Sequence, residues 1–376
     1  MTLLDTFLDM LGDLEPVFPQ HRTYRIAVRQ AVGTLGTLGR HTISRIIWGI
    51  GRDQESWSSD YRLFSRSPWN PSDLFQPILA RTTAHSHPQH IAIAMDDTRL
   101  HKTGRNIKTA SYTRDPLSPP FHINLIFGLR FLQASALLPL YREGASAARG
   151  VPVRFTEVPV VKKPGKKASE EDHRRYQEQV RENNLSHHAV AMLRDLRAAY
   201  DAAGAADKIL IAVGDGSFCN RTVLSVNVPQ THWLVRCRKD AVLCQPAFLL
   251  TTDLLSPANI LIQMYFDRWE IEINHRDEKD LLGVGEAQVR STQSVPRQPA
   301  FVVAAYSTLL LAALSRFGPG RTDVYLPLPK WRRKARRPSL LDLVAIFRKE
   351  MVENPHRVES FGIKTSAKTL LTTAAA

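Results

Sequence analysis

The chain contains the stretch IAIAMDDT at residues 91–98 and a second stretch of the same kind, ILIAVGDG, at residues 209–216. Each is a continuous apolar run of strand length, as expected of a buried central strand, and aspartate follows it directly. Open α/β sheets place ligand sites at the carboxyl ends of strands, where the chain exits into a crevice. The two stretches therefore predict a sheet with carboxylates at one edge.

The first candidate site residue is Asp97, just past the strand expected at Ile91–Met95. Asp96 precedes it, and alternation along an extended chain points the two side chains to opposite sides. Only one of them can face a shared site, and we select Asp97. The second candidate is Asp215, whose flanking glycines let the backbone turn and a ligand come close. An ordinary Asp-Gly turn is the alternative there.

The third candidate is Glu272, in the segment YFDRWEIEINHRDEK at residues 265–279. A helix from Pro257 to Leu282 would place five polar side chains within roughly 80° of one another, with an apolar stripe alongside for docking. The polar stripe contains Tyr265, Arg268, Glu272, Arg276 and Lys279, and the apolar stripe contains Ile262, Phe266, Trp269 and Ile273. The alternative is a solvated face with ion pairs such as Arg268–Glu272.

The pattern Tyr265, Arg268, Glu272 and Lys279 matches, at every spacing, the Tyr-Arg-Glu-Lys signature of one group of DDE-superfamily transposases from bacterial insertion sequences. IAMDDT and VGDGSF resemble the two aspartate motifs of that family, and the likeness covers residues from about 40 to 340. One departure is His275, where the family commonly has an aromatic residue. Another is the short interval between Asp215 and Glu272, which leaves room only for a small insertion near residues 218–255.

The resemblance implies a ribonuclease-H-like catalytic core, as in retroviral integrases. It implies two Mg²⁺ ions, with Mn²⁺ as a substitute, held by Asp97, Asp215 and Glu272. Arg268 and Lys279 would then clamp phosphates and Tyr265 would position the transferred strand. Further phosphate contacts are expected from Arg276 and Arg290. The implied partners are terminal inverted repeats, target DNA and a second copy of the chain in a synaptic homodimer.

Two other functions fit the same residues: a metal-dependent DNA endonuclease without strand transfer, and a catalytically silent DNA-binding protein derived from a transposase. The composition suits all three, because a net charge of +14 and a pI near 9.9 favour polyanions. The basic run Lys330–Arg337 would hold flanking DNA without sequence preference. A merely basic soluble protein is the plain alternative for the charge.

The expected fold class is mixed α/β, with a central mixed sheet flanked by helices and a helical N-terminal domain. We expect a helical DNA-binding segment at residues 1–87, built either as a helix-turn-helix or as a plain bundle. The catalytic domain follows at 88–318 and a basic segment at 319–376.

The cellular location is expected to be the cytoplasm, in association with the nucleoid. The longest apolar run, Pro299–Leu314, is shorter than a membrane span and predicts a buried core helix. The N-terminus carries acidic residues in place of a basic signal-peptide region. Three sparse cysteines argue for a reducing compartment. The histidines of HSHPQH at residues 85–90 are expected in a loop, not around zinc.

Overall fold

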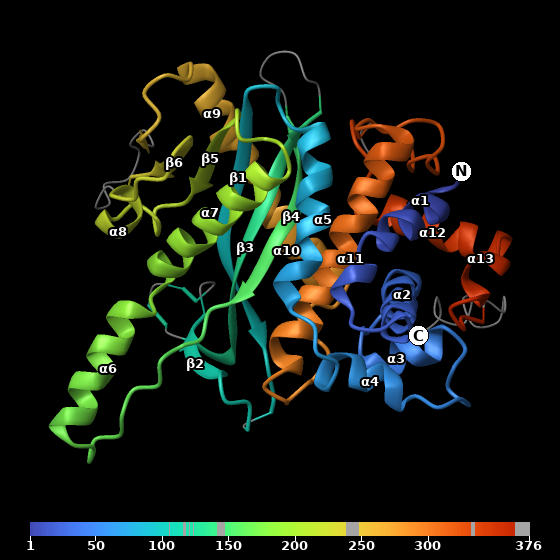
Figure 1. The fold of residues 1–376 in the computed structure, drawn as a ribbon, viewed down its shortest axis with the longest axis horizontal. Helices are drawn as coiled ribbons and strands as arrows, with labels where there is room; N and C mark the ends of the chain where they lie inside the picture. Colours follow the sequence, from blue (N-terminus) through green and yellow to red (C-terminus); the bar gives the residue numbers. More distant parts are fainter. Residues whose placement is uncertain are drawn as a thin grey trace. The chain divides into compact units, whose positions relative to one another are not determined.

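The computed structural model describes residues 1–104, 106–115, 118–119, 121–122, 124–140, 147–237, 248–331 and 335–364. The fold is mixed α/β, with a curled mixed sheet flanked by helices (Figure 1). The chain divides into two compact units: unit 1 contains Met1–Arg81 and Ile273–Ala376, and unit 2 contains Thr82–Glu272. Three consecutive segments were expected instead, but helices from both ends of the chain share one core in unit 1.

The sheet lies in unit 2, where its described strands run in the order β2-β3-β1-β5-β6-β7, with β4 also paired to β3. β1, β3 and β4 pair antiparallel, whereas β5 is parallel to β1 and β6 is parallel to β5. The bounds are β1 His90–His101, β2 Ser111–Arg114, β3 Leu125–Pro139, β4 Ala148–Glu157, β5 Ile209–Gly214, β6 Thr231–Arg236 and β7 Leu249–Thr251.

Residues 218–255, expected to hold a small insertion, contribute β6 and β7 to the central sheet itself. The sequence predicts weaker strands at Trp233–Val235 and Ala241–Leu243. β6 confirms the first, and the second lies outside the described residues. Cys219 and Cys237 are free thiols with their Sγ atoms 4.0 Å apart.

The helices of unit 2 are α6 Glu170–Glu182, α7 Leu185–Ala202, α8 Arg221–Leu224, α9 Ala258–Asp267 and α10 Glu270–Arg276, which runs on past the unit's end. The sequence of residues 169–203 predicts one long helix, charged in its first half and apolar on one face in its second. This prediction is wrong, because Asn184 caps a new helix by accepting a hydrogen bond from His187 N. Figure 1 shows α6 extending away from the sheet and α7 crossing it. The second half of that predicted helix has Val190, Leu193, Leu196 and Tyr200 on a core face, and all four are buried in α7.

Unit 1 is helical in its described part. It contains α1 Leu3–Gly12, α2 His21–Gly36, α3 Ile43–Gly49, α4 Ser58–Ser65, α5 Phe75–Thr82, α11 Ser294–Phe317, α12 Leu340–Glu353 and α13 His356–Glu359. α11 packs against α1 and α2, and α12 packs against the same two helices. The backbone N–H groups of Leu3 and Leu4 donate to the carboxylate of Glu350, which ties the N-terminus to α12.

Helix α11 confirms the buried core helix expected at Pro299–Leu314. Among the described helices, it alone has the length and apolarity of a membrane span, yet 78% of its apolar window is buried, as in the core of a soluble protein. The close packing of unit 1 also explains Gly33, which lies inside α2. A Cβ there would approach Ile46 Cγ2 to 2.7 Å.

Candidate active site

The register between β1 and β5 sets the positions of the aspartates. His90 pairs with Ile209 and Ala94 with Val213, so two further residues along each chain bring Asp96 level with Asp215. Asp215 directly follows β5, as expected. Asp97, by contrast, lies within β1 and not past its end. The expected end at Met95 is wrong, because β1 pairs with β3 as far as His101.

Strand alternation separates Asp96 from Asp97. Ala92 and Ala94 of β1 belong to one apolar cluster with Ile211 and Val213 of β5. The antiparallel ladder of β1 with β3 continues from Ile93 to His101 without a register shift, so Asp96 continues the face of Ala94. Asp97 lies on the opposite face.

Asp97 is held by arginines on its face of the sheet. Its carboxylate accepts two hydrogen bonds from Arg130, from Nε at 2.8 Å and from Nη2 at 2.9 Å. Arg99 Nε lies 3.7 Å from Asp97 Oδ2. Burial, and then the charge of Arg130, lower the pKa of His188 in α7, which places this cluster on the α7 side. Both oxygens of Asp97 are therefore already engaged by cations.

The face of Asp96 is the one covered by α9 and α10. Leu261 and Met264 of α9 and Ile271 of α10 belong to the same apolar cluster as Ala92 and Ala94. Glu270 Oε2 accepts a hydrogen bond from Gly150 N of β4 at 3.1 Å, which fixes the start of α10 on the sheet. Asp96 Oδ1 accepts a hydrogen bond from the backbone N–H of Asp97 at 2.8 Å.

The loop after β5 holds Asp215 by local hydrogen bonds. Its Oδ1 accepts from Ser217 N at 2.8 Å and from Ser217 Oγ, and within the described chain these bonds leave Oδ2 for a ligand. Gly214 is required by close packing, because a Cβ there would approach the Phe218 ring to 2.8 Å. Asp215 can therefore both stabilise the turn after β5 and offer a carboxylate oxygen to a ligand.

Glu272 follows Ile271, the fully buried residue that docks α10. Its side chain is 38% exposed, and Oε1 lies 3.5 Å from Arg268 Nη1. This is the ion pair that the sequence predicts if the polar stripe is only a solvated helix face. Arg268, however, is only 12% exposed, and neither its Nε nor its Nη1 has a hydrogen-bond partner among the described residues. A buried guanidinium with unmet donors is suited to an anion.

The single helix expected at Pro257–Leu282 is wrong. It is interrupted after Asp267, resumes at Glu270 and ends in a π-helical turn at Asp277–Leu281. The expected docking stripe is wrong as well, since Ile262, Phe266 and Trp269 are 47%, 69% and 63% exposed. A helical wheel assumes a constant 100° step, which the interruption at Arg268 breaks. Tyr265 and Arg268 nevertheless stay together, with Arg268 Cζ 5.9 Å from the Tyr265 ring centre.

The other expected phosphate contacts belong to unit 1. Lys279 is in the π-helical turn, and Arg276 Nη2 lies 3.0 Å from Asp277 Oδ1. Arg290 lines a cleft of about 430 Å³ with Tyr61 of α4. Their contribution to the site of unit 2 stays a prediction.

No metal centre is preassembled in the described part of the chain, where no three His, Cys, Asp or Glu side chains are gathered to hold one ion. In the HSHPQH segment, His87 Nδ1 lies 3.3 Å from His90 Nδ1, and His90 Nε2, at the start of β1, contacts Ser256 Oγ at 3.0 Å. Of the basic run Lys330–Arg337, residues 332–334 lie outside the described chain.

No protein-family model matches this chain, and no curated protein matches its sequence.

Proposed function

We propose that the protein is a DDE-superfamily DNA transposase, which cleaves DNA at insertion-sequence ends and joins the freed 3′-OH to target DNA. The observation that carries the proposal is the register of the parallel strands β1 and β5, in which Ala94 pairs with Val213. Two residues further along each chain, Asp96 comes level with Asp215 on the face of the sheet covered by α9 and α10. Adjacent strands lie about 4.8 Å apart, so two such carboxylates can reach one divalent cation.

The sheet topology supports a ribonuclease-H-like core. Three antiparallel strands, β1, β3 and β4, are followed by a crossover through α7 to β5, parallel to β1, and then by β6, parallel to β5. The position of α9 against β4, β5 and β6 adds the covering helix of such a fold.

The carboxylates fit the ion that the proposal requires, since Mg²⁺ prefers hard oxygen ligands and retains several waters. Asp96, Asp215 and Glu272 would hold it, with Asp96 in the place first assigned to Asp97. This exchange rests on the faces of β1 and on the arginines that already bind Asp97. Asp96 must give up its bond to the backbone of Asp97, and Glu272 its weak pairing with Arg268.

Mg²⁺ held by these carboxylates would supply positive charge that stabilises the attacking and leaving oxygens of a phosphodiester. Arg268 would donate its unmet N–H groups to a phosphate beside the scissile bond. The Tyr265 ring beside it would fix the direction of the guanidinium and contact the transferred strand. Mn²⁺ is expected to replace Mg²⁺, the acting form to be a homodimer that holds two DNA ends, and the location to be the nucleoid.

The test is metal-dependent cutting and joining of a DNA fragment that carries the inverted repeats flanking the gene. Wild type is expected to cut and join with Mg²⁺ or Mn²⁺ and to do neither in EDTA. Glu272→Gln is expected to bind the fragment without cutting it. Cutting without joining would leave an endonuclease, and binding without any cutting by wild type would leave a silent DNA-binding protein. Either result would end the transposase proposal.

A further inference from the structure

Unit 1 contains a cleft of about 700 Å³ between α2, α4 and the chain at Phe361–Gly362. Five arginines line it, and we call it the arginine cleft: Arg22, Arg25, Arg29, Arg52 and Arg62. No Asp or Glu side chain from the described residues lines it. Three of the arginines lie at positions i, i+3 and i+7 of α2, which places them on one face of that helix. This spacing is visible in the sequence and was not used in the prediction above.

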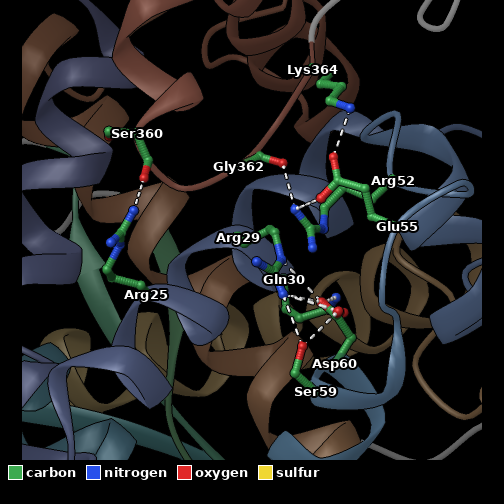
Figure 2. A network of polar contacts seen from close by, with 10 residues as sticks. All are labelled: Arg25, Arg29, Gln30, Arg52, Glu55, Ser59, Asp60, Ser360, Gly362 and Lys364. Carbon is green, nitrogen blue, oxygen red and sulfur yellow. Dashed lines mark hydrogen bonds and ion pairs between the residues drawn. The ribbon is translucent and has the colours of Figure 1, made fainter.

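The floor of the arginine cleft is built from a buried ion pair. Arg29 Nη2 donates to both carboxylate oxygens of Asp60, at 2.9 and 3.0 Å, and Gln30 Nε2 donates to Asp60 Oδ1 at 2.7 Å (Figure 2). Asp60 is fully buried and Arg29 is 7% exposed. The charge of Arg29 is thereby neutralised, and its position relative to α4 is fixed.

One wall is closed by the chain that follows α13. Arg52 Nη1 lies 2.6 Å from Glu55 Oε2 and donates to Gly362 O at 3.3 Å, while Lys364 Nζ lies 2.7 Å from Glu55 Oε1. Arg25 donates to Ser360 O (Figure 2). Arg52 Nε is buried and has no hydrogen-bond partner among the described residues. An anion can therefore still be bound from this wall.

The rim carries the uncompensated charge. Arg22, Arg25 and Arg62 are exposed, and no carboxylate of the described chain pairs with any of them. Counting Lys364, six cations surround the cleft against two carboxylates, Glu55 and Asp60. The first turn of α4 has no side-chain cap, and Ser58 and Ser59 of that turn line the cleft. Uncapped N–H groups at a helix N-terminus favour an anion.

Helix α4 forms a ridge with a second cleft on its other side. Tyr61 and Ser65 line that cleft together with Arg290. Trp57 and Tyr61 are 57% and 38% exposed on the ridge, whereas Phe64 and Trp69 are buried. The sequence predicts that these four aromatic residues serve packing, and burial confirms this for Phe64 and Trp69. Cations on both sides of an exposed ridge fit an extended ligand with repeating negative charge better than one small phosphorylated molecule.

We propose that the arginine cleft binds backbone phosphates of duplex DNA through Arg22, Arg25 and Arg62, while the Arg29–Asp60 and Arg52–Glu55 pairs hold its shape. The choice of DNA rests on the proposed function; the choice of phosphate rests on the cleft alone. Each phosphate neutralised by a cation contributes about −0.9 to the slope of log K against log salt concentration. Three contacts therefore predict a slope change of about 2.7.

The experiment compares three full-length proteins: wild type, the triple variant Arg22→Gln/Arg25→Gln/Arg62→Gln, and the charge-matched control Arg174→Gln/Arg181→Gln/Arg194→Gln in α6 and α7. A fluorescent 30-bp duplex of arbitrary sequence is titrated at several salt concentrations, and circular dichroism checks that each variant folds. We expect the cleft variant to lose about 2.7 from the salt slope, and at least about tenfold in affinity at 0.1 M salt, relative to the control.

Equal slopes and affinities for the cleft variant and the control would overturn the proposal. Competition by millimolar inorganic phosphate as effective as that of unlabelled duplex, charge for charge, would overturn the assignment to DNA. Metal-dependent nicking, measured on the same samples at saturating DNA, separates this proposal from the proposed function. A wild type that binds through the cleft but never nicks supports the cleft and removes the transposase.

Discussion

Asp96 and Asp97 are neighbours in the sequence but lie in different surroundings on the two faces of β1. On one face, Asp97 is bound by both nitrogens of a guanidinium fork and approached by a second arginine. On the other, Asp96 lies level with Asp215 under α9 and α10, where Arg268 Nε and Nη1 are buried and have no hydrogen-bond partner among the described residues. The first arrangement pairs the carboxylate with arginines inside the fold, whereas the second is the one that we propose to bind a metal ion and a phosphate.

The sharpest test of this comparison is the pair Asp96→Asn and Asp97→Asn. Both changes are isosteric and remove one charge from the same strand. Asp96→Asn is expected to reduce DNA cutting on the order of 10³-fold, because loss of a metal ligand removes several kcal/mol of charge stabilisation. Asp97→Asn is expected to cut within a few-fold of wild type. Single-turnover cleavage with Mg²⁺ at saturating DNA measures both.

The reverse result, with Asp96→Asn active and Asp97→Asn inactive, would return the first metal ligand to Asp97. It would also require Arg130 to release that carboxylate when the ions bind. Melting curves for both variants separate a lost ligand from a lost fold.

A second prediction concerns Lys102, just beyond β1 and 4% exposed. Burial lowers the pKa of its ammonium from 10.5 to about 8. The unfolded chain therefore binds more protons between pH 8 and 10.5, and this lysine makes stability rise with pH across that window. Lys102→Met removes the penalty and is expected to stabilise the fold by up to about 3 kcal/mol at pH 7.

The measurement is urea unfolding of wild type and Lys102→Met at pH 7 and pH 9.5. The stability difference between the two proteins should shrink as the pH rises. A constant difference would show that Lys102 is not desolvated in the folded protein. Such a result would show that water reaches the Lys102 ammonium in the folded protein.

The sequence predicted the parts of this fold that depend on local pattern. The apolar runs before Asp97 and Asp215 are paired parallel strands, and the run in α11 is buried as expected. The sequence does not indicate which of Asp96 and Asp97 faces the covering helices. Alternation places the two side chains on opposite faces of β1 but does not identify the face that the helices cover. β4, with its mixed Ala148–Glu157 sequence, and the interruption at Arg268 depend on partners distant in the chain, to which a periodicity analysis is blind.

A third prediction concerns the contribution of the Asp97–Arg130 pair to the stability of the fold. In Asp97→Asn, Arg130 keeps its charge at 23% exposure and loses its partner, so a stability loss of about 1–2 kcal/mol is expected. Arg130→Gln is expected to cost a similar amount. Together the two changes should cost less than their sum, by about 1 kcal/mol, in a double-mutant cycle from urea unfolding at pH 7. Strict additivity would mean that the Asp97–Arg130 hydrogen bonds contribute nothing to stability. A structural role for Asp97 would then be excluded.

The smallest expected effect belongs to Arg268→Lys, on the face of Asp96. Lysine retains the positive charge but loses the planar fork, so a guanidinium that donates to a phosphate in the transition state should lose about tenfold in cutting rate when replaced. Ground-state affinity for DNA should change little, because one charge among many cations is conserved. Single-turnover rates and binding titrations separate the two quantities. The matched control is Arg194→Lys, at an exposed position of α7. If Arg268→Lys cuts as fast as that control, its unmet donors serve the interruption between α9 and α10 and not the reaction, and the face of Asp96 would then lack its expected phosphate contact.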